Sequence, residues 1–383
     1  MTIFGTRPEA VKMAPIVTGL VSDPRFEAIT VLTAQHREML DQVVELFGIT
    51  PDVDLDLCRP GQTLTELTAR IITDVGAVIA QRRPDVVLVQ GDTTSTFVGA
   101  LAAFYAQVPV VHVEAGLRTG DLASPFPEEG NRRLVGTIAD LHLPPTQTSA
   151  DNLLREGVDR SRIVITGNSV IDALRLSLER YTEVPDVIAD LTPDQRVLLV
   201  TAHRRESWGE PMRQAASAIA ELARTESDLV VVFPIHRNPI VRDAVMPELE
   251  GLGNVRVVEP LPYGDFCRVM HRSDLILTDS GGVQEEAPSL GKPVLVMRDT
   301  TERPEAVEAG TVLLVGTDRP QILREARRLL HDPLEYAAMA MAVNPYGDGR
   351  AVERTLDALA HRYAGGVAPE EFVPERTDVS VRS

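Results

Sequence analysis

Three carboxylates in the first half of the sequence stand where acid–base chemistry could be carried out. Asp92 follows the short apolar run at 85–90, Glu114 directly follows the run at 108–113, and Glu128 opens a helix-like stretch soon afterwards. Carboxylates gathered at one edge of a sheet repel one another and raise at least one pKa, which suits groups that accept and deliver protons. For Glu128 a second explanation stays open, the stabilisation of a helix N-terminus by a negative charge.

Cations follow the first apolar run, where an anion could bind. Gly5 ends that run, and Arg7 and Lys12 lie in the first turns of the predicted helix behind it. The free backbone N–H groups at a helix start attract an anion, and the two cations would add charge there. The alternative is an ordinary turn with solvated cations.

A glycine pair opens another predicted helix in the second half. Ser280, Gly281 and Gly282 follow an apolar run, and such small residues let phosphate oxygens approach backbone N–H groups. Glu286, about one turn later, is placed to accept hydrogen bonds from ribose hydroxyls. Arg303 is a further candidate phosphate ligand, the alternative being a residue of a surface loop.

Two histidines also follow apolar runs of the second half. His203 is flanked by Arg204 and Arg205, so an anionic ligand could be bound with an imidazole beside it. His236 is similarly placed after the run at 229–234, and for this residue a structural and a functional role both stay open.

The apolar runs alternate with helical stretches, as in parallel sheets covered by helices on both faces. The series pauses at the polar stretch 182–194 and then restarts. This pattern predicts two doubly wound α/β domains with a cleft between them, because ligands gather beyond the carboxyl ends of such strands. We assign 1–168 and 169–349 to the two domains, add the helix 350–363 to the first, and expect a flexible tail over 364–383.

Composition narrows the function further. The 383 residues include 38 Lys+Arg and 56 Asp+Glu, a formal net charge of -18, which disfavours binding of nucleic acid through a general basic surface. The two cysteines lie far apart outside any metal motif, and no apolar run is long enough to span a membrane. We therefore expect a cytoplasmic protein with no metal and no membrane or nucleic-acid partner. Without GxGxxG after the first strand or GxxxxGK[ST] anywhere, no nucleotide cofactor of the usual kind is expected.

Taken together and in order, eight stretches of the sequence resemble the bacterial non-hydrolysing UDP-N-acetylglucosamine 2-epimerases. The stretches are GTRPEAVK (5–12), TAQHRE (33–38), GDTT (91–94), HVEAGLR (112–118), PEE (127–129), HRRE (203–206), DSGGVQEE (279–286) and RDTTERPE (298–305). The similarity extends from residue 2 to about residue 363 and leaves out only the tail.

The resemblance implies a GT-B fold, with two Rossmann-like domains and UDP held mainly by the second, in an enzyme that is a homodimer without a cofactor. It implies catalytic roles for Asp92, Glu114, Glu128 and His203. The positions expected to bind UDP are Arg7, Lys12, Phe266, Ser280, Gly281, Gly282, Glu286 and Arg303. An allosteric pocket for UDP-N-acetylglucosamine would involve Gln35, Glu38, Arg204 and His236.

The resemblance also implies a reaction, the epimerisation of UDP-N-acetylglucosamine at carbon 2 to UDP-N-acetylmannosamine. The hydrogen on carbon 2 is not adjacent to a carbonyl, so either oxidation or loss of UDP must precede its removal. The residues favour elimination of UDP to 2-acetamidoglucal and its re-addition, because they provide bases and phosphate ligands. A hydrolysing epimerase, a retaining glycosyltransferase and a non-catalytic UDP-sugar sensor are the alternatives.

Overall fold

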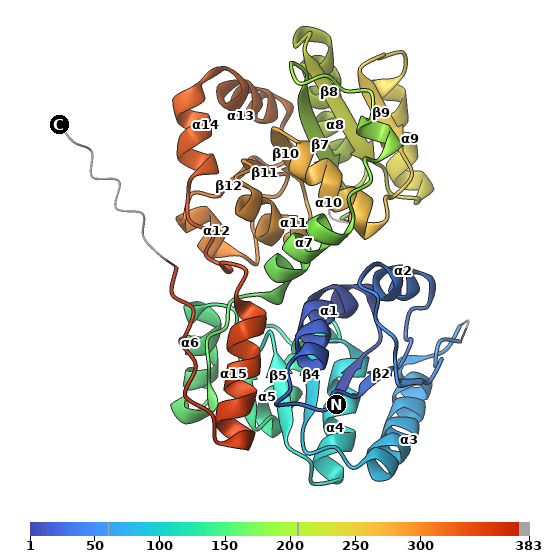
Figure 1. The fold of residues 1–383 in the computed structure, drawn as a ribbon. Helices are drawn as coiled ribbons and strands as arrows, with labels where there is room; N and C mark the ends of the chain where they lie inside the picture. The colour runs from blue at the N-terminus through green and yellow to red at the C-terminus, as the bar shows by residue number, and fades with distance from the viewer. Residues whose placement is uncertain (60, 205–206, 375–383) are drawn as a thin grey trace, which may run out of the picture. The chain divides into compact units, whose positions relative to one another are not determined.

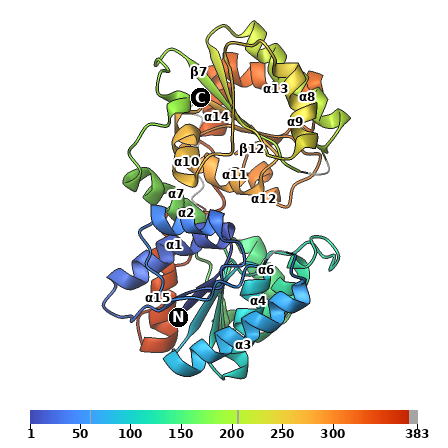
Figure 2. The same ribbon diagram turned by 90° about the vertical axis from the view of Figure 1, so that its right-hand side faces the viewer.

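The computed structural model describes residues 1–59, 61–204 and 207–374. The chain forms two compact units (Figures 1 and 2). The first comprises Met1–Arg180 and Tyr346–Val373, and the second comprises Tyr181–Pro345.

The first unit is built on a six-stranded parallel sheet in the order β3-β2-β1-β4-β5-β6. Its strands are β1 (Thr2–Phe4), β2 (Thr30–Leu32), β3 (Val53–Asp54), β4 (Val87–Gln90), β5 (Val110–Val113) and β6 (Leu141–Leu143). Its helices are α1 (Arg7–Ser22), α2 (Glu38–Leu46), α3 (Leu64–Arg82), α4 (Thr94–Tyr105), α5 (Glu128–Ile138), α6 (Gln147–Arg155), α7 (Ser169–Arg180) and α15 (Ala351–Ala364). Helix α4 packs between α3 and α5, while α1 packs against α2, α7 and α15. The apolar strands are thus buried on both faces, as the sequence predicts.

The second unit repeats this design with the order β12-β11-β10-β7-β8-β9. Its strands are β7 (Arg196–Thr201), β8 (Leu229–Pro234), β9 (Val255–Val258), β10 (Leu275–Thr278), β11 (Val294–Val296) and β12 (Val312–Leu314). Its helices are α8 (Glu210–Thr225), α9 (Pro239–Leu249), α10 (Tyr263–Arg272), α11 (Gly281–Glu286), α12 (Pro304–Glu308), α13 (Arg319–His331) and α14 (Pro333–Ala340). The prediction of two doubly wound parallel sheets is confirmed.

In each sheet the winding direction reverses between two central strands, β1 and β4 in the first unit and β10 and β7 in the second. Connections on either side of such a point leave on opposite faces, which opens a crevice at the carboxyl ends of the strands. The turns after these four strands, together with the helices α1 and α11 that follow two of them, carry most of the candidate site residues.

Two boundaries differ from the sequence prediction. Helix α7 packs against α1 and α15, so the first unit extends to Arg180 instead of ending at 168. The predicted tail also begins later, because Phe372 is only 4% exposed and its N–H donates to the carbonyl of Ile165 at 2.8 Å. One large apolar side chain in an extended segment gives no periodic signal, which is why the sequence pattern missed this contact. The rest of the predicted tail, 375–383, lies outside the described residues.

Two buried histidines should make the stability of the first unit depend on pH. His112 and His142 face each other across β5 and β6, and both are 0% exposed. Burial lowers the pKa of His112 to about 4 and that of His142 to about 3, from 6.5. The unfolded chain therefore binds more protons below pH 6.5, and the free energy of unfolding falls as the pH drops, by roughly 3 kcal/mol near pH 4 for His112 alone.

Urea unfolding between pH 7.5 and about pH 4.5 measures this effect, with His142→Leu as the comparison because it removes one titrating ring and keeps an apolar side chain. The variant should lose stability less steeply with falling pH. Parallel curves for the two proteins would contradict the assignment.

Candidate active site

A buried glutamate joins the turns after β1 and β4 in the first unit. Glu9 is 1% exposed, and its Oε2 accepts hydrogen bonds from the backbone N–H groups of Gly5 (3.0 Å) and Thr6 (2.8 Å). Its Oε1 accepts from the hydroxyls of Thr93 (2.7 Å) and Thr96 (2.8 Å). Burial raises the pKa of Glu9, against the effect of these hydrogen bonds. The residue thereby holds two turns that carry candidate site residues next to each other.

Glu114 is fixed by donors from three directions. Its carboxylate forms an ion pair with Lys12 and accepts hydrogen bonds from the side-chain amides of Gln90 and Asn168, the latter at 3.0 Å. The Lys12 and Glu114 side chains are only 15% and 7% exposed. The backbone φ of Glu114 is +59°, a conformation that is uncommon for residues other than glycine and is found at functional sites. The structure therefore brings two predicted site residues, Lys12 and Glu114, into direct contact.

Asp92 belongs to a second charged network, centred on Arg132. The guanidinium of Arg132 contacts the Asp92 carboxylate and also donates to Glu129 at 3.1 Å. Burial alone would lower the pKa of Arg132, but the two carboxylates raise it above its usual value. Asp92 remains 27% exposed, whereas Glu129 is 0% exposed and also accepts from the backbone N–H groups of Thr119 and Gly120. Burial alone would raise the pKa of Glu129, but these hydrogen bonds and the nearby arginines outweigh it, so the pKa of Glu129 is lowered below its usual value.

Glu128 and Arg7 are less constrained. Glu128 is half-buried at the first position of α5 and forms no hydrogen bond with any described residue. Arg7 is half-exposed at the first position of α1 and has no ion-pair partner in the described part of the chain. Both side chains are therefore available to a ligand.

In the second unit, His203 is oriented by a buried aspartate. Nδ1 of His203 lies 2.8 Å from Oδ1 of Asp279, while Oδ2 of Asp279 accepts from the backbone N–H groups of His203 (2.7 Å) and Arg204 (2.8 Å). Burial raises the pKa of Asp279, but His203 and these N–H groups lower it below its usual value. Because Asp279 faces Nδ1, the other ring nitrogen of His203, Nε2, is not engaged by the aspartate. The His203 side chain is 46% exposed. Asp279 opens the stretch DSGGVQEE, but the sequence around it does not indicate this contact with His203.

The glycine pair and Arg303 form one arrangement at the start of α11. Arg303 donates from Nε to Glu285 at 2.7 Å and lies against Gly281, where a Cβ atom would come within 2.6 Å of its Nη1. At Gly282 a Cβ atom would meet only ordinary contacts, the nearest being Glu286 at 3.6 Å. The structure thus brings Arg303 next to the predicted Ser280–Gly282 segment.

Glu286 is held from α10. It is 6% exposed, and its Oε1 accepts a hydrogen bond from the Tyr263 hydroxyl at 2.7 Å. Burial raises the pKa of Tyr263 well above its usual value. Phe266 lies on the same helix and is half-buried.

The four residues predicted for an allosteric pocket divide between the two units. Gln35 accepts a hydrogen bond from the Ser95 hydroxyl at 2.9 Å, and Glu38 opens α2 with a side chain outside the described part. In the second unit Arg204 lies 3.7 Å from Glu302, and the exposed ring of His236 accepts from the backbone of Asn238. Arg205 is not among the described residues.

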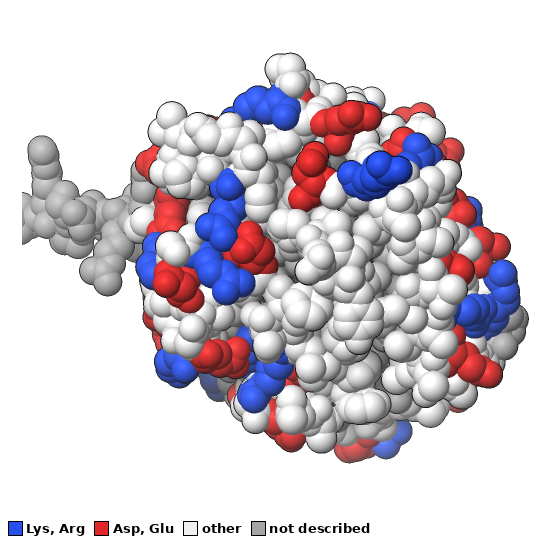
Figure 3. Space-filling model, turned by 90° about the horizontal axis from the view of Figure 1, so that it is seen from below, with Lys and Arg blue, Asp and Glu red and all other residues white. Residues whose placement is uncertain are grey.

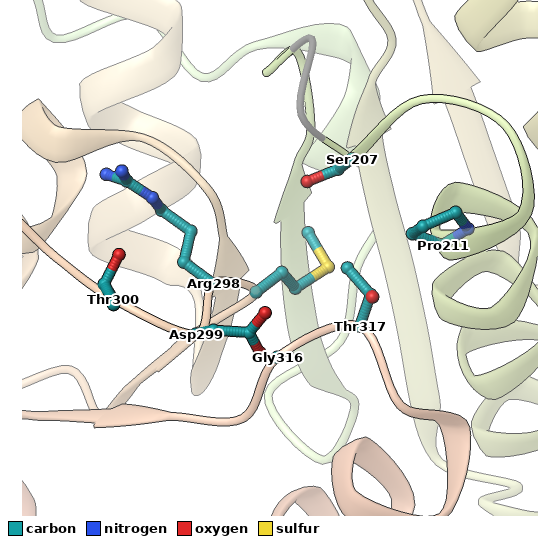
Figure 4. A pocket seen from close by; sticks show the side chains of 8 residues that line it. Ser207, Pro211, Arg298, Asp299, Thr300, Gly316 and Thr317 are labelled. Carbon is teal, nitrogen blue, oxygen red and sulfur yellow. The ribbon is translucent and has the colours of Figure 1, made fainter. Parts of the chain in front are cut away.

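A pocket of about 350 Å³ lies in the second unit, and Arg298, Asp299 and Thr300 of the stretch 298–305 help to line it (Figure 4). The segments after β7, β11 and β12 and the start of α8 line it, and Ser207 and Thr317 contribute hydroxyls. None of the predicted site residues lines it.

The described residues contain no metal-binding cluster. No group of three or more His, Cys, Asp or Glu side chains among them could hold a metal ion. None of the described helices combines the length and hydropathy of a membrane span. On the face drawn in Figure 3, basic and acidic side chains are interspersed around an uncharged area.

Comparison with known proteins decides the family. Residues 19–360 match the sequence model of a family described as UDP-N-acetylglucosamine 2-epimerase. The chain belongs to this epimerase family. It is 56% identical over 366 residues to UDP-N-acetylglucosamine 2-epimerase of Escherichia coli K12. The aligned region covers 94% of this chain and 97% of the relative. These epimerases are isomerases, so the chain is a member of an enzyme family.

Solved structures of epimerases share the fold. A putative UDP-N-acetylglucosamine 2-epimerase from Listeria monocytogenes is 48% identical with a TM-score of 0.93, covering 97% of this chain and 98% of the other. The epimerase from Neisseria meningitidis, solved bound to UDP-GlcNAc, is 47% identical with a TM-score of 0.85, covering 94% and 99%. The fold is thus the GT-B type of these epimerases.

Proposed function

We propose that this epimerase interconverts UDP-N-acetylglucosamine and UDP-N-acetylmannosamine by eliminating UDP and adding it back. Family membership supports the overall reaction, and a relative of 47% identity was solved with UDP-GlcNAc bound. The observation that carries the mechanism is the contrast among three carboxylates, because Glu114 is saturated with donors while Asp92 and Glu128 keep access to a ligand.

The reaction is redox-neutral. A carboxylate takes the proton from carbon 2, its C–H electrons form the carbon 1–carbon 2 double bond, and the carbon 1–oxygen bond breaks with its electron pair leaving on UDP. Re-addition forms the carbon 1–oxygen bond again while a proton is delivered to the opposite face of carbon 2. Two faces require two proton-handling groups, for which we propose Asp92 and Glu128.

The other residues bind and orient. Glu114 holds Lys12, and Lys12 and Arg7 provide positive charge on the first unit. On the second unit, Arg303 with Ser280, Gly281 and Gly282 would stabilise the diphosphate, and Glu286 would accept from the ribose. Phe266 would contact UDP. Asp279 keeps Nε2 of His203 available to departing UDP, since Nδ1 faces the aspartate.

The reaction run in deuterated water tests this mechanism. Incubation of the protein with UDP-N-acetylglucosamine alone should give UDP-N-acetylmannosamine with deuterium at carbon 2, read by NMR. Epimerised product without deuterium would exclude the elimination. Free N-acetylmannosamine would indicate a hydrolysing enzyme, and UDP binding without any exchange would indicate a sensor.

Gly281→Ala should weaken UDP binding by about tenfold to a hundredfold, because the added methyl group displaces the Arg303 guanidinium and one charge-assisted hydrogen bond contributes about 1.5–3 kcal/mol. Isothermal titration with UDP measures the effect. Gly253→Ala is the matched control, since a Cβ there meets no atom within 4 Å and the residue lies in the second unit outside the proposed UDP site. Equal affinities for the two variants would remove Arg303 from the UDP site.

We further propose that the protein is cytoplasmic and forms a homodimer. We also propose that a second molecule of UDP-N-acetylglucosamine activates the enzyme by binding at Gln35, Glu38, Arg204 and His236. Two free cysteines support a reducing compartment, and the exposed pair Phe104 and Tyr105 supports an apolar contact between subunits. Light scattering would measure the oligomeric state.

The kinetics of His236→Ala test the second binding site. Loss of sigmoidal kinetics in this variant would support the site, and unchanged kinetics would contradict it.

A further inference from the structure

Asn168, the residue before α7, connects three parts of the first unit. It is 3% exposed, and its Oδ1 accepts a hydrogen bond from the backbone N–H of Val170 at 3.1 Å. Because this bond fixes which end of the amide is oxygen, the Nδ2 group must face the other way, where it donates to Oε1 of Glu114 at 3.0 Å. Its backbone N–H donates to the carbonyl of Tyr346 at 2.6 Å.

Tyr346 is the first residue of the segment that returns to the first unit after Pro345. The next residue, Gly347, lies against Asn168 and α7, since a Cβ atom there would come 3.1 Å from Ile171 and 3.4 Å from the Asn168 nitrogen. One turn further along α7, Asp172 accepts from the backbone N–H groups at the start of α15. The returning segment is therefore anchored on the first turns of α7, with Asn168 at the contact.

We propose that Asn168 is a positioning residue, which orients the Glu114 carboxylate and links its hydrogen bonding to the point where the chain returns at Tyr346. This inference rests on the proposed function. Glu114 has an unusual backbone conformation and bonds to Lys12 and Gln90 on its other side, so the Asn168 amide completes its orientation. Lys12 in turn is held by that carboxylate.

The decisive variants keep the helix cap and change only what faces Glu114. Asn168→Asp retains an oxygen for the Val170 N–H but sets a carboxylate about 3 Å from Glu114, where like charges raise a pKa. Charged or titratable groups near Glu114 among the described residues include Lys12 on α1 and His112 on β5. We expect kcat at pH 7 to fall at least tenfold and the acidic limb of its pH profile to move up by about one unit, with KM changed less than about threefold.

Asn168→Ser also keeps a capping oxygen but has no amide to donate, so kcat should fall without the upward shift of the acidic limb. Asp172→Asn is the control for a purely structural role, because it loosens the same returning segment without touching Glu114. It should lower the unfolding midpoint in urea and leave the pH profile unchanged.

A wild-type profile in both Asn168 variants would overturn the proposal, and so would an Asp172→Asn profile shifted like that of Asn168→Asp. Failure of the proposed function is a separate result, since the wild-type protein would then show no epimerised product in any of these assays.

Discussion

Replacement of Asp92 by asparagine is expected to lower turnover by roughly 10²–10⁴-fold, the usual effect of losing a general acid or base. Asparagine keeps an oxygen for Arg132 but cannot carry the proton of carbon 2. The measurement is kcat for UDP-N-acetylglucosamine, with deuterium exchange at carbon 2 as a second readout. Binding of UDP should persist, because the proposed diphosphate ligands Arg303 and Ser280–Gly282 belong to the second unit.

Asp121→Asn provides a matched control for this variant. Asp121 lies in the loop before α5, is exposed, and accepts from the backbone N–H of Ala123. Its loss should leave turnover near the wild-type value. If Asp92→Asn retains more than about a tenth of the activity, Asp92 is not a proton carrier.

The position of the candidate site could be predicted from the sequence because parallel strands deliver the following residues to one edge of a sheet. Asp92, Glu114 and His203 were found in this way, each a residue or two beyond a buried strand. The same rule indicated the Ser280–Gly282 segment after β10. Strand ends are local features, so short windows of sequence contain the signal.

The partners of these residues could not be predicted, because each pairing joins positions far apart in the chain. Lys12 was expected to bind UDP, and nothing in its neighbourhood indicates the contact with Glu114, 102 residues away. Asp279 similarly reaches His203 from the neighbouring strand. Glu9 lies in the stretch GTRPEAVK, but its role depends on Thr93 and Thr96, which reach it only when β1 and β4 pair.

Adjacent glutamates at the start of α5 illustrate a second limit on predicting the site from the sequence. The position at a helix start and the resemblance both indicate Glu128, whereas the structure gives its neighbour Glu129 the greater share of hydrogen bonds. A helix turns about 100° per residue, so Glu129 faces the protein while Glu128 stays accessible. Fully bonded carboxylates are poor proton carriers, and Glu129 is better explained as the anchor of Arg132.

These networks also explain how an acidic protein can bind a diphosphate. The formal net charge of -18 would repel UDP if the site carboxylates were unpaired. Asp92 and Glu129 pair with Arg132 and Arg133, and Glu114 pairs with Lys12. Since paired charges cancel over a few ångströms, the field near the site is set by the remaining cations.

Glu114→Gln is expected to have the second large effect, on stability as well as on activity. Glutamine removes the negative charge that Lys12 faces in a mostly buried pair, which typically costs about 3–5 kcal/mol. Turnover should fall by roughly 10²-fold or more, because Lys12 loses its counter-charge and one amide oxygen cannot replace the two carboxylate oxygens that orient Lys12, Asn168 and Gln90. Urea unfolding gives the free energy, and initial rates give the turnover.

The double variant Lys12→Met/Glu114→Gln separates the two effects. Removal of both charges should recover most of the lost stability, because neither member of the pair then remains buried without its counter-charge. Activity should stay low, since the proposed charge on Lys12 is missing. A double variant as unstable as Glu114→Gln would show that the ion pair does not account for the stability loss, and a double variant with restored turnover would remove both residues from the mechanism.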